Sequence, residues 1–161
     1  MIGNRNLRGK IKVYLDVCCL SRPFDDQTQD KVRLESEAVI AILKQVELGE
    51  ILMVSSDAIL YEISKIPDQG RREKIGLVIS KGQIYVEVDW GIMDRSIKIQ
   101  KLGIKSYDAL HVACAERGKS DIFLTTDDKL LKKLKKYSSY VNIKAENPLI
   151  WMMELMSDET I

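Results

Sequence analysis

Ile11-Lys-Val-Tyr-Leu-Asp16 near the start of the chain and Ile122-Phe-Leu-Thr-Thr-Asp127 near its end are short apolar runs that both finish on an aspartate. Such runs of β-branched and aromatic residues, each followed by a helical pattern, are typical of strands buried in a parallel sheet. Ligands of open α/β folds bind at the carboxyl ends of the strands. We therefore expect Asp16 and Asp127 to lie at one functional edge of a sheet.

The rest of the chain alternates in the same way. Further strands are predicted at 51–54, 84–88 and 140–145, and helices at 32–48, 57–66, 71–81, 92–102, 107–116, 129–136 and after Pro148. The polar segment 21–30 is predicted to be a loop above the site. This alternation predicts an α/β protein with three α/β/α layers and a central parallel sheet of about five strands. Because no linker-like segment interrupts it, we expect residues 1–161 to form a single domain.

Composition narrows the class of protein. The net charge is only +1, so any evidence for a nucleic-acid partner must be local. The three cysteines and the single histidine, His111, have no zinc-site or disulfide-framework spacing. No apolar run approaches the ~20 residues of a membrane span. These features favour a soluble cytoplasmic protein with no membrane partner.

Two more acids stand inside predicted helices, Glu62 and Asp108. Taken singly, each acid has an ordinary explanation: Asp16 could open a turn, Asp127 could cap the helix that follows, and Asp108 could follow a Ser106 cap. Asp57 is predicted to cap the helix that carries Glu62. Taken together, four carboxylates at one rim need a proton or a cation to offset their repulsion. Carboxylate oxygens suit Mg²⁺ or Mn²⁺.

In their order along the chain, these motifs resemble the PIN domain, the RNase H-like nuclease fold used by toxins of the VapC type. Val13-Tyr-Leu-Asp16 is similar to the strand-end aspartate of that family, and Glu62 to its helical acid. Asp108-Ala-Leu-His-Val-Ala113 resembles its aspartate followed by small residues, and Thr125-Thr-Asp127 its last element. Val17-Cys18 departs from the Thr-Asn or Thr-Ser pair that many members carry after the first aspartate.

The resemblance implies a metal-dependent endoribonuclease that hydrolyses RNA phosphodiester bonds, with Mg²⁺ or Mn²⁺ as cofactor. It also implies an antitoxin protein as a partner and a homodimer. Asp16 and Asp108 are expected to be direct ligands, with Glu62 and Asp127 completing the acidic cluster directly or through water. Asp128 is a weaker candidate, and Asp25 and Asp26 are expected to be solvated.

Other residues near these motifs have less specific expectations. The lysines between Lys129 and Lys136 could add affinity for a nucleic-acid backbone, although a solvated helix face is favoured. Arg22 is an alternative phosphate contact. His111 is expected to be a packed helix residue rather than a base.

Two alternatives remain open from the sequence. The first is a phosphoacceptor receiver domain with Asp16 as its early acid, Asp89 as the phosphorylated residue, Thr125 as the switch hydroxyl and Lys144 as the late lysine. It leaves Glu62 and Asp108 unexplained. The second is a non-catalytic module that keeps the PIN fold and acts through binding. A dinucleotide-binding enzyme is disfavoured, because no Gly-x-Gly-x-x-Gly follows the first strand.

Overall fold

A computed structural model describes residues 9–159, except for the side chain of Glu159. Its central sheet has five strands in the order β3-β2-β1-β4-β5, and every neighbouring pair is parallel. The strands are β1 (Ile11–Leu15), β2 (Ile51–Ser56), β3 (Ile84–Val86), β4 (Ile122–Leu124) and β5 (Lys144–Glu146). The predicted α/β/α architecture is confirmed, with the aspartate-tipped strands β1 and β4 side by side at its centre.

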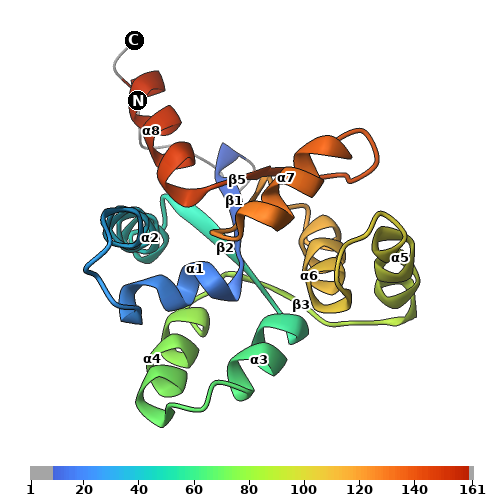
Figure 1. Ribbon diagram of the computed structural model, residues 1–161, viewed down its shortest axis with the longest axis horizontal. Helices are drawn as coiled ribbons and strands as arrows, with labels where there is room; N and C mark the ends of the chain where they lie inside the picture. The colour runs from blue at the N-terminus through green and yellow to red at the C-terminus, as the bar shows by residue number, and fades with distance from the viewer. Residues whose placement is uncertain (1–8, 160–161) are drawn as a thin grey trace.

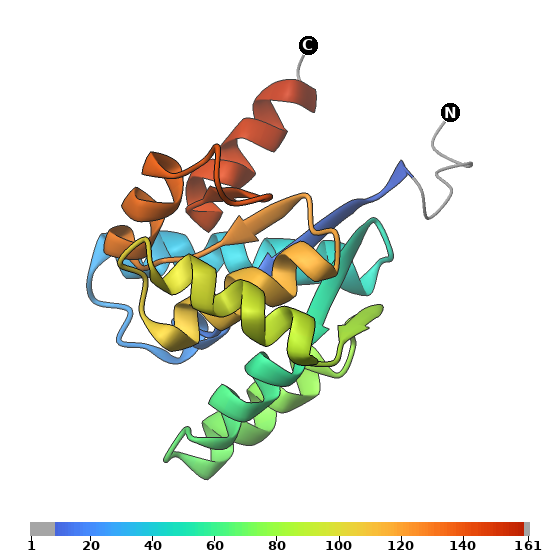
Figure 2. The ribbon, with the colours of Figure 1, turned by 90° about the vertical axis from the view of Figure 1, so that its right-hand side faces the viewer.

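Helices cover both faces of this sheet. They are α1 (Val17–Ser21), η3 (Arg22–Phe24, a 3₁₀ helix), α2 (Asp30–Glu47), α3 (Asp57–Ser64), α4 (Gln69–Ile79), α5 (Trp90–Gln100), α6 (Ser106–Arg117), α7 (Asp128–Lys136) and α8 (Pro148–Glu159). Figure 1 shows α2 on one side of the sheet and α6 with α5 on the other. In Figure 2, α3 and α4 extend together below the sheet. No helix among residues 9–159 is both long and apolar enough to cross a membrane.

Helix α6 packs closely on the sheet because its inner face is made of small residues. Ala109, Ala113 and Ala115 are at most 2 % exposed, and Cys114 is fully buried. Small side chains let the backbone of a helix approach its neighbours, and they lose little rotamer freedom on burial. The position of this helix is therefore set mainly by its backbone.

Two predicted boundaries are wrong. The predicted strand 140–145 is mostly a turn followed by β5, because Tyr140 and Val141 donate their backbone N–H groups to Tyr137 O instead of a sheet ladder. The predicted loop 21–30 begins inside α1 and continues as η3, where Pro23 fits the first turn of a helix. Arg71 of α4 ties this segment down through Asp25.

Two predicted helix caps are also wrong. Ser56, not Asp57, caps α3 by accepting a hydrogen bond from Ile59 N. Asp57 instead accepts hydrogen bonds from the Tyr85 hydroxyl and from Val88 N, so it anchors the end of β3. Helix α6 starts at Ser106, and its N-cap residue Lys105 makes no side-chain cap.

Gly118, just beyond α6, provides a test of this close packing. A Cβ there would lie 2.7 Å from Val54 Cγ1 and 3.1 Å from Val86 Cγ2. Gly118→Ala should lower the free energy of unfolding by about 1 to 3 kcal/mol, because overpacking a tight core forces its neighbours apart. Gly76→Ala in α4 is the matched control: nothing lies within 4 Å of its Cβ position, so it should stabilise by about 0.5 to 1 kcal/mol. Urea unfolding measures both, and equal effects would refute close packing at Gly118.

Candidate active site

Asp16 follows the central strand β1 and is only 5 % exposed. Although it occupies the N-cap position of α1, its carboxylate makes no capping hydrogen bond, so it does more than open a turn. Its Oδ2 accepts a hydrogen bond of 3.1 Å from the Thr125 hydroxyl, at the end of the adjacent strand β4. The Asp16 carboxylate therefore points along the shared carboxyl edge of β1 and β4.

Cys18 is the second of the two residues that stand after Asp16 in place of a Thr-Asn or Thr-Ser pair. Its Sγ lies 3.4 Å from Thr125 Oγ1 and accepts a hydrogen bond of 3.4 Å from Thr126 N. Because the Thr125 hydroxyl donates to Asp16, the thiol of Cys18 can donate to Thr125 Oγ1. This thiol therefore supports the group that holds Asp16, a role that the sequence did not suggest.

Glu62 is held by a chain of buried hydrogen bonds that starts in the sheet. The Ser56 hydroxyl at the end of β2 lies 2.8 Å from the Tyr14 hydroxyl of β1. Tyr14 Oη lies 2.7 Å from His111 Nδ1 on α6, and His111 Nε2 lies 2.9 Å from Glu62 Oε2 on α3. Both ring nitrogens of the only histidine therefore have partners, and His111 orients Glu62.

His111 was expected to be a packed helix residue, and it is fully buried. Burial alone would disfavour its charged form. The hydrogen bond to Glu62 and the negative charge of Asp16 outweigh burial, and the pKa of His111 is raised. Its contact with Glu62 was missed because it joins residues 49 positions apart in the chain, and no local pattern signals it.

Asp108 and Asp127 lie together in a neighbouring cleft of about 80 Å³. Asp108 is half-buried in the first turn of α6 and forms no helix cap. Asp127 precedes α7, and its Oδ1 accepts hydrogen bonds from Lys129 N and Leu130 N, so the capping role considered for it is real. Lys105, Lys129 and Lys133 line the same cleft. Part of the basic run thus borders the acids, while Leu130 and Leu134 beneath it are buried.

The charges of Asp16, Asp127 and Glu62 act on Asp108. Burial, with the negative charges of Asp16 and Asp127, raises the pKa of Asp108 to about 6. Burial also raises the pKa of Asp16; the nearby His111 opposes this most, the charge of Glu62 adds to it, and the hydrogen bond from Thr125 opposes it. These carboxylates resist ionisation because they are buried and because they repel one another. A bound cation would offset that repulsion, so the cluster is suited to hold one.

One group of side chains is compact enough to hold a single ion. Ligand atoms of Asp16, Glu62 and His111 lie within 4.8 Å of one another. The group does not include Asp108 or Asp127, so the expectation that Asp108 is a direct ligand remains a prediction. An imidazole nitrogen that donates a proton to Glu62 cannot also bind a metal, and the donor set that remains is carboxylate oxygen, which suits Mg²⁺ or Mn²⁺.

Two residues considered from the sequence have other partners. Arg22, considered as a phosphate contact, is paired with Glu35 at 3.0 Å and Asp25 at 3.2 Å. Asp89 caps α5 and is paired with Arg117 at 2.6 Å. It follows the edge strand β3, which β2 separates from β1. The receiver alternative therefore has its phosphorylated residue two strands away from Asp16 and held in an ion pair.

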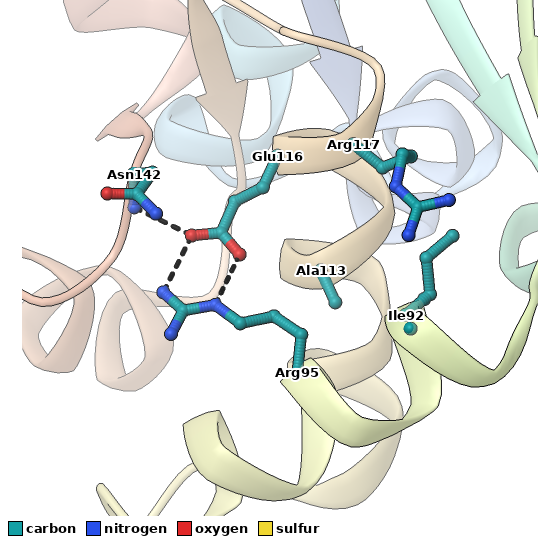
Figure 3. A pocket seen from close by; sticks show the side chains of 7 residues that line it. Ile92, Arg95, Ala113, Glu116, Arg117 and Asn142 are labelled. Carbon is teal, nitrogen blue, oxygen red and sulfur yellow. Dashed lines mark hydrogen bonds and ion pairs between the residues drawn. The ribbon is translucent and has the colours of Figure 1, made fainter.

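A larger cavity of about 250 Å³ lies at the other end of α6 (Figure 3). There Arg95 forms two hydrogen bonds with Glu116, at 2.8 and 2.9 Å, and Glu116 also accepts one from Asn142 N. Asp108 is two turns away on the same helix, roughly 12 Å along its axis. Arg95 and Glu116 pair with each other and hold the backbone of Tyr140 and Asn142, so we assign this cavity a structural role in holding the turn before β5.

The structure defines an α/β protein with a parallel sheet and acidic side chains gathered at the carboxyl ends of its strands, where open α/β folds bind their ligands. Within that class, residues 13–137 match the family model described as PIN domain. The match covers most of the chain, which therefore belongs to the PIN domain family, as its motifs predicted. No curated protein matches the sequence.

Among the solved structures that resemble the fold are VapBC2 from Rickettsia felis and PAE2754 from Pyrobaculum aerophilum. VapBC2 from Rickettsia felis, bound to a DNA fragment from its promoter, has a TM-score of 0.52 and 12 % identity, with 85 % of this chain and 98 % of that chain covered. PAE2754 from Pyrobaculum aerophilum has a TM-score of 0.52 and 15 % identity, with 96 % and 99 % covered. At these identities the likeness establishes the fold alone.

The raised pKa of Asp108 predicts a pH dependence of stability. Between about pH 4 and 6 the native carboxyl binds a proton that the unfolded chain has released, so the stabilisation present below pH 4 is lost as the pH rises through 6. Asp108→Asn should therefore be more stable than the wild type above pH 6, on the order of 1 to 2 kcal/mol after allowance for solvent screening. The difference should shrink towards pH 4.

Urea unfolding with a chelator present, at several pH values, measures this difference. Asp94→Asn, an exposed acid on α5, is the control and should follow the wild type throughout. A constant difference between Asp108→Asn and wild type from pH 4 to 7 would contradict the assignment.

Proposed function

We propose that the protein is a metal-dependent endoribonuclease that hydrolyses RNA phosphodiester bonds with Mg²⁺ or Mn²⁺. The observation that supports this most is the convergence of Asp16, Glu62 and Asp108, with Asp127 beside them, at the carboxyl edge of a PIN-domain sheet. Such a cluster is costly for the folded protein unless a cation offsets it. When a protein keeps such unfavourable repulsion between carboxylates in a cleft at the strand ends, this points to a functional site.

The residues have distinct roles in this proposal. Asp16 and Asp108 would be the direct ligands, and Glu62 and Asp127 would complete the cluster directly or through water. A bound Mg²⁺ or Mn²⁺ supplies positive charge to the phosphate oxygens and lowers the pKa of an attacking water. Thr125 and His111 are positioning residues, because they touch the carboxylates of Asp16 and Glu62.

The RNA substrate and the toxin role rest on the PIN resemblance. A VapBC2 structure among the similar folds favours an antitoxin partner, and a homodimer and a cytoplasmic setting belong to the same proposal. The cleft lysines Lys105, Lys129 and Lys133 support a polyanionic substrate, because cations beside a phosphate backbone gain affinity through counterion release. A non-catalytic PIN module is the alternative that the test below must exclude.

Asp16→Asn tests the metal site directly. The substitution keeps the shape of the side chain and an oxygen that can accept from Thr125, but it removes the charge. Manganese-dependent cleavage of a mixed RNA substrate should fall more than about 100-fold, since even residues that only orient metal ligands are worth 10- to 100-fold. The rise in melting temperature that Mn²⁺ produces in the wild type should also be lost.

Asp94→Asn on α5 is again the control and should keep both cleavage and the thermal shift. Cleavage of RNA by Asp16→Asn at the wild-type rate would remove Asp16 from the mechanism. A wild-type protein that binds RNA but shows neither cleavage nor a metal-dependent shift would favour the non-catalytic module.

Asp127 allows its capping role to be separated from its catalytic role. Asp127→Asn keeps an acceptor oxygen for Lys129 N and Leu130 N, so its free energy of unfolding should stay near that of the wild type while cleavage falls. Asp127→Ala should lose cleavage and, in addition, about 0.5 to 2 kcal/mol of stability. Melting curves and cleavage rates of the two variants provide the comparison, and full activity in Asp127→Asn would leave Asp127 as a cap alone.

A further inference from the structure

Two exposed tyrosines form a stacked pair between α3 and α6. The ring centroids of Tyr61 and Tyr107 lie 5.8 Å apart, with an angle of 17° between the ring planes. Each residue is 49 % exposed. Large aromatic rings usually contribute to stability through burial, and these two leave much of their apolar surface in water. The pair is therefore poorly explained as core.

The pair lies beside the proposed catalytic acids. Tyr61 immediately precedes Glu62 on α3, and Tyr107 immediately precedes Asp108 on α6. Consecutive helix residues diverge by about 100°, so the two tyrosines flank the carboxylate cluster without pointing into it. Because the two rings contact each other, they bridge α3 and α6 at the rim of the site.

The pair is not required to hold these helices together. The buried hydrogen bond between His111 and Glu62 already joins α6 to α3, and Ile59 and Ile63 of α3 and Ala109 and Val112 of α6 belong to the same buried core. The exposed rings therefore add a flat aromatic surface where other contacts already hold α3 and α6 together. This leaves the surface available for a ligand.

The surroundings of the pair favour a nucleobase as that ligand. Lys65 Nζ lies 5.0 Å from the Tyr61 ring centroid, and Lys105 lines the cleft that holds Asp108. Tyr107 is 49 % exposed, and among the described residues its ring contact is with Tyr61, so part of its surface is accessible to a ligand. An accessible aromatic surface with cations nearby, beside a site for a phosphodiester, is the combination that binds unpaired bases of single strands.

We propose that Tyr107, backed by Tyr61, is a stacking platform for one unpaired base of a single-stranded nucleic acid next to the scissile phosphate. The inference rests on the proposed nuclease function and adds to it the residues that would contact a base of the substrate. Base pairing would keep that base within a duplex stack and away from the ring. The platform has no base preference of its own, because every base has a π-face.

The test is the affinity for a labelled single-stranded oligoribonucleotide of about ten nucleotides, measured by fluorescence anisotropy with a chelator present to prevent turnover. Tyr107→Ala should weaken binding about 10- to 100-fold, which is the usual loss for one stacked base. Tyr107→Phe loses the hydroxyl but keeps the ring, so it should bind within about three-fold of the wild type. Trp90→Ala on α5 removes a ring that is 85 % exposed and serves as the control, with no expected effect.

A strand with one abasic position at a time identifies the base concerned. At one position the abasic strand should bind wild type and Tyr107→Ala equally, because the partner of the ring is already missing. An RNA duplex of the same sequence should bind both proteins equally. Unchanged affinity in Tyr107→Ala, or the same loss for the duplex, would overturn the platform.

The other occupant of such a surface would be a protein. If Tyr107→Ala changed the mass of the protein in light scattering while its RNA affinity stayed the same, the pair would be a protein contact and the proposal would fail. Failure here is distinct from failure of the proposed function. If the wild type cleaves RNA but Tyr107→Ala binds RNA with unchanged affinity, only the stacking platform is refuted. If Tyr107→Ala loses affinity but the wild type shows no metal-dependent cleavage, only the nuclease function is refuted.

Discussion

One buried chain of hydrogen bonds organises the whole site: Ser56 to Tyr14, Tyr14 to His111, and His111 to Glu62. It starts at the ends of two strands, passes through α6 and finishes on α3. Polar groups this deeply buried are stable only when each has a partner, so these elements cannot move independently without leaving one unsatisfied. The chain also explains a tyrosine in the centre of a buried strand, because its ring packs on Phe123 while its hydroxyl serves the site.

The acids at the same edge show how the fold tolerates charge that it does not neutralise. Elsewhere, buried carboxylates are paired: Glu35 with Arg22 and Glu146 with Lys135. Asp16 is as buried as these but has no Lys or Arg partner: a hydroxyl donates to it and His111 lies nearby, while Asp108 has other acids as neighbours. Among the described residues, the protein thus pairs its structural buried carboxylates with Lys or Arg, and at the converging strands it leaves His111 as the nearby cationic group. The difference separates supporting acids from candidate catalytic ones.

Local pattern was enough to predict the sheet and the acids. The runs before Asp16 and Asp127 had the composition of buried strands, and a parallel sheet then placed both acids at one edge. Long-range partners were beyond local pattern: nothing near His111 in the sequence indicates that its ring bridges Tyr14 and Glu62. The false strand at 140–145 arose because Val141 and Ile143 alternate in burial, as in a strand, while their backbone forms turns. The alternation of apolar residues in the sequence therefore predicted which side chains are buried more reliably than it predicted the backbone hydrogen bonds.

The alanine face of α6 has a consequence for how this site can change over time. Ala109, Ala113 and Ala115 leave no rotamers to rearrange, so a larger residue at any of them must move the whole helix. That helix carries Tyr107, Asp108 and His111. A modest enlargement could keep a hydrophobic, folded interior and still shift all three together relative to Asp16. Activity would then be lost while the fold persisted, and sequence drift along this one helix would separate active members of such a family from inactive ones.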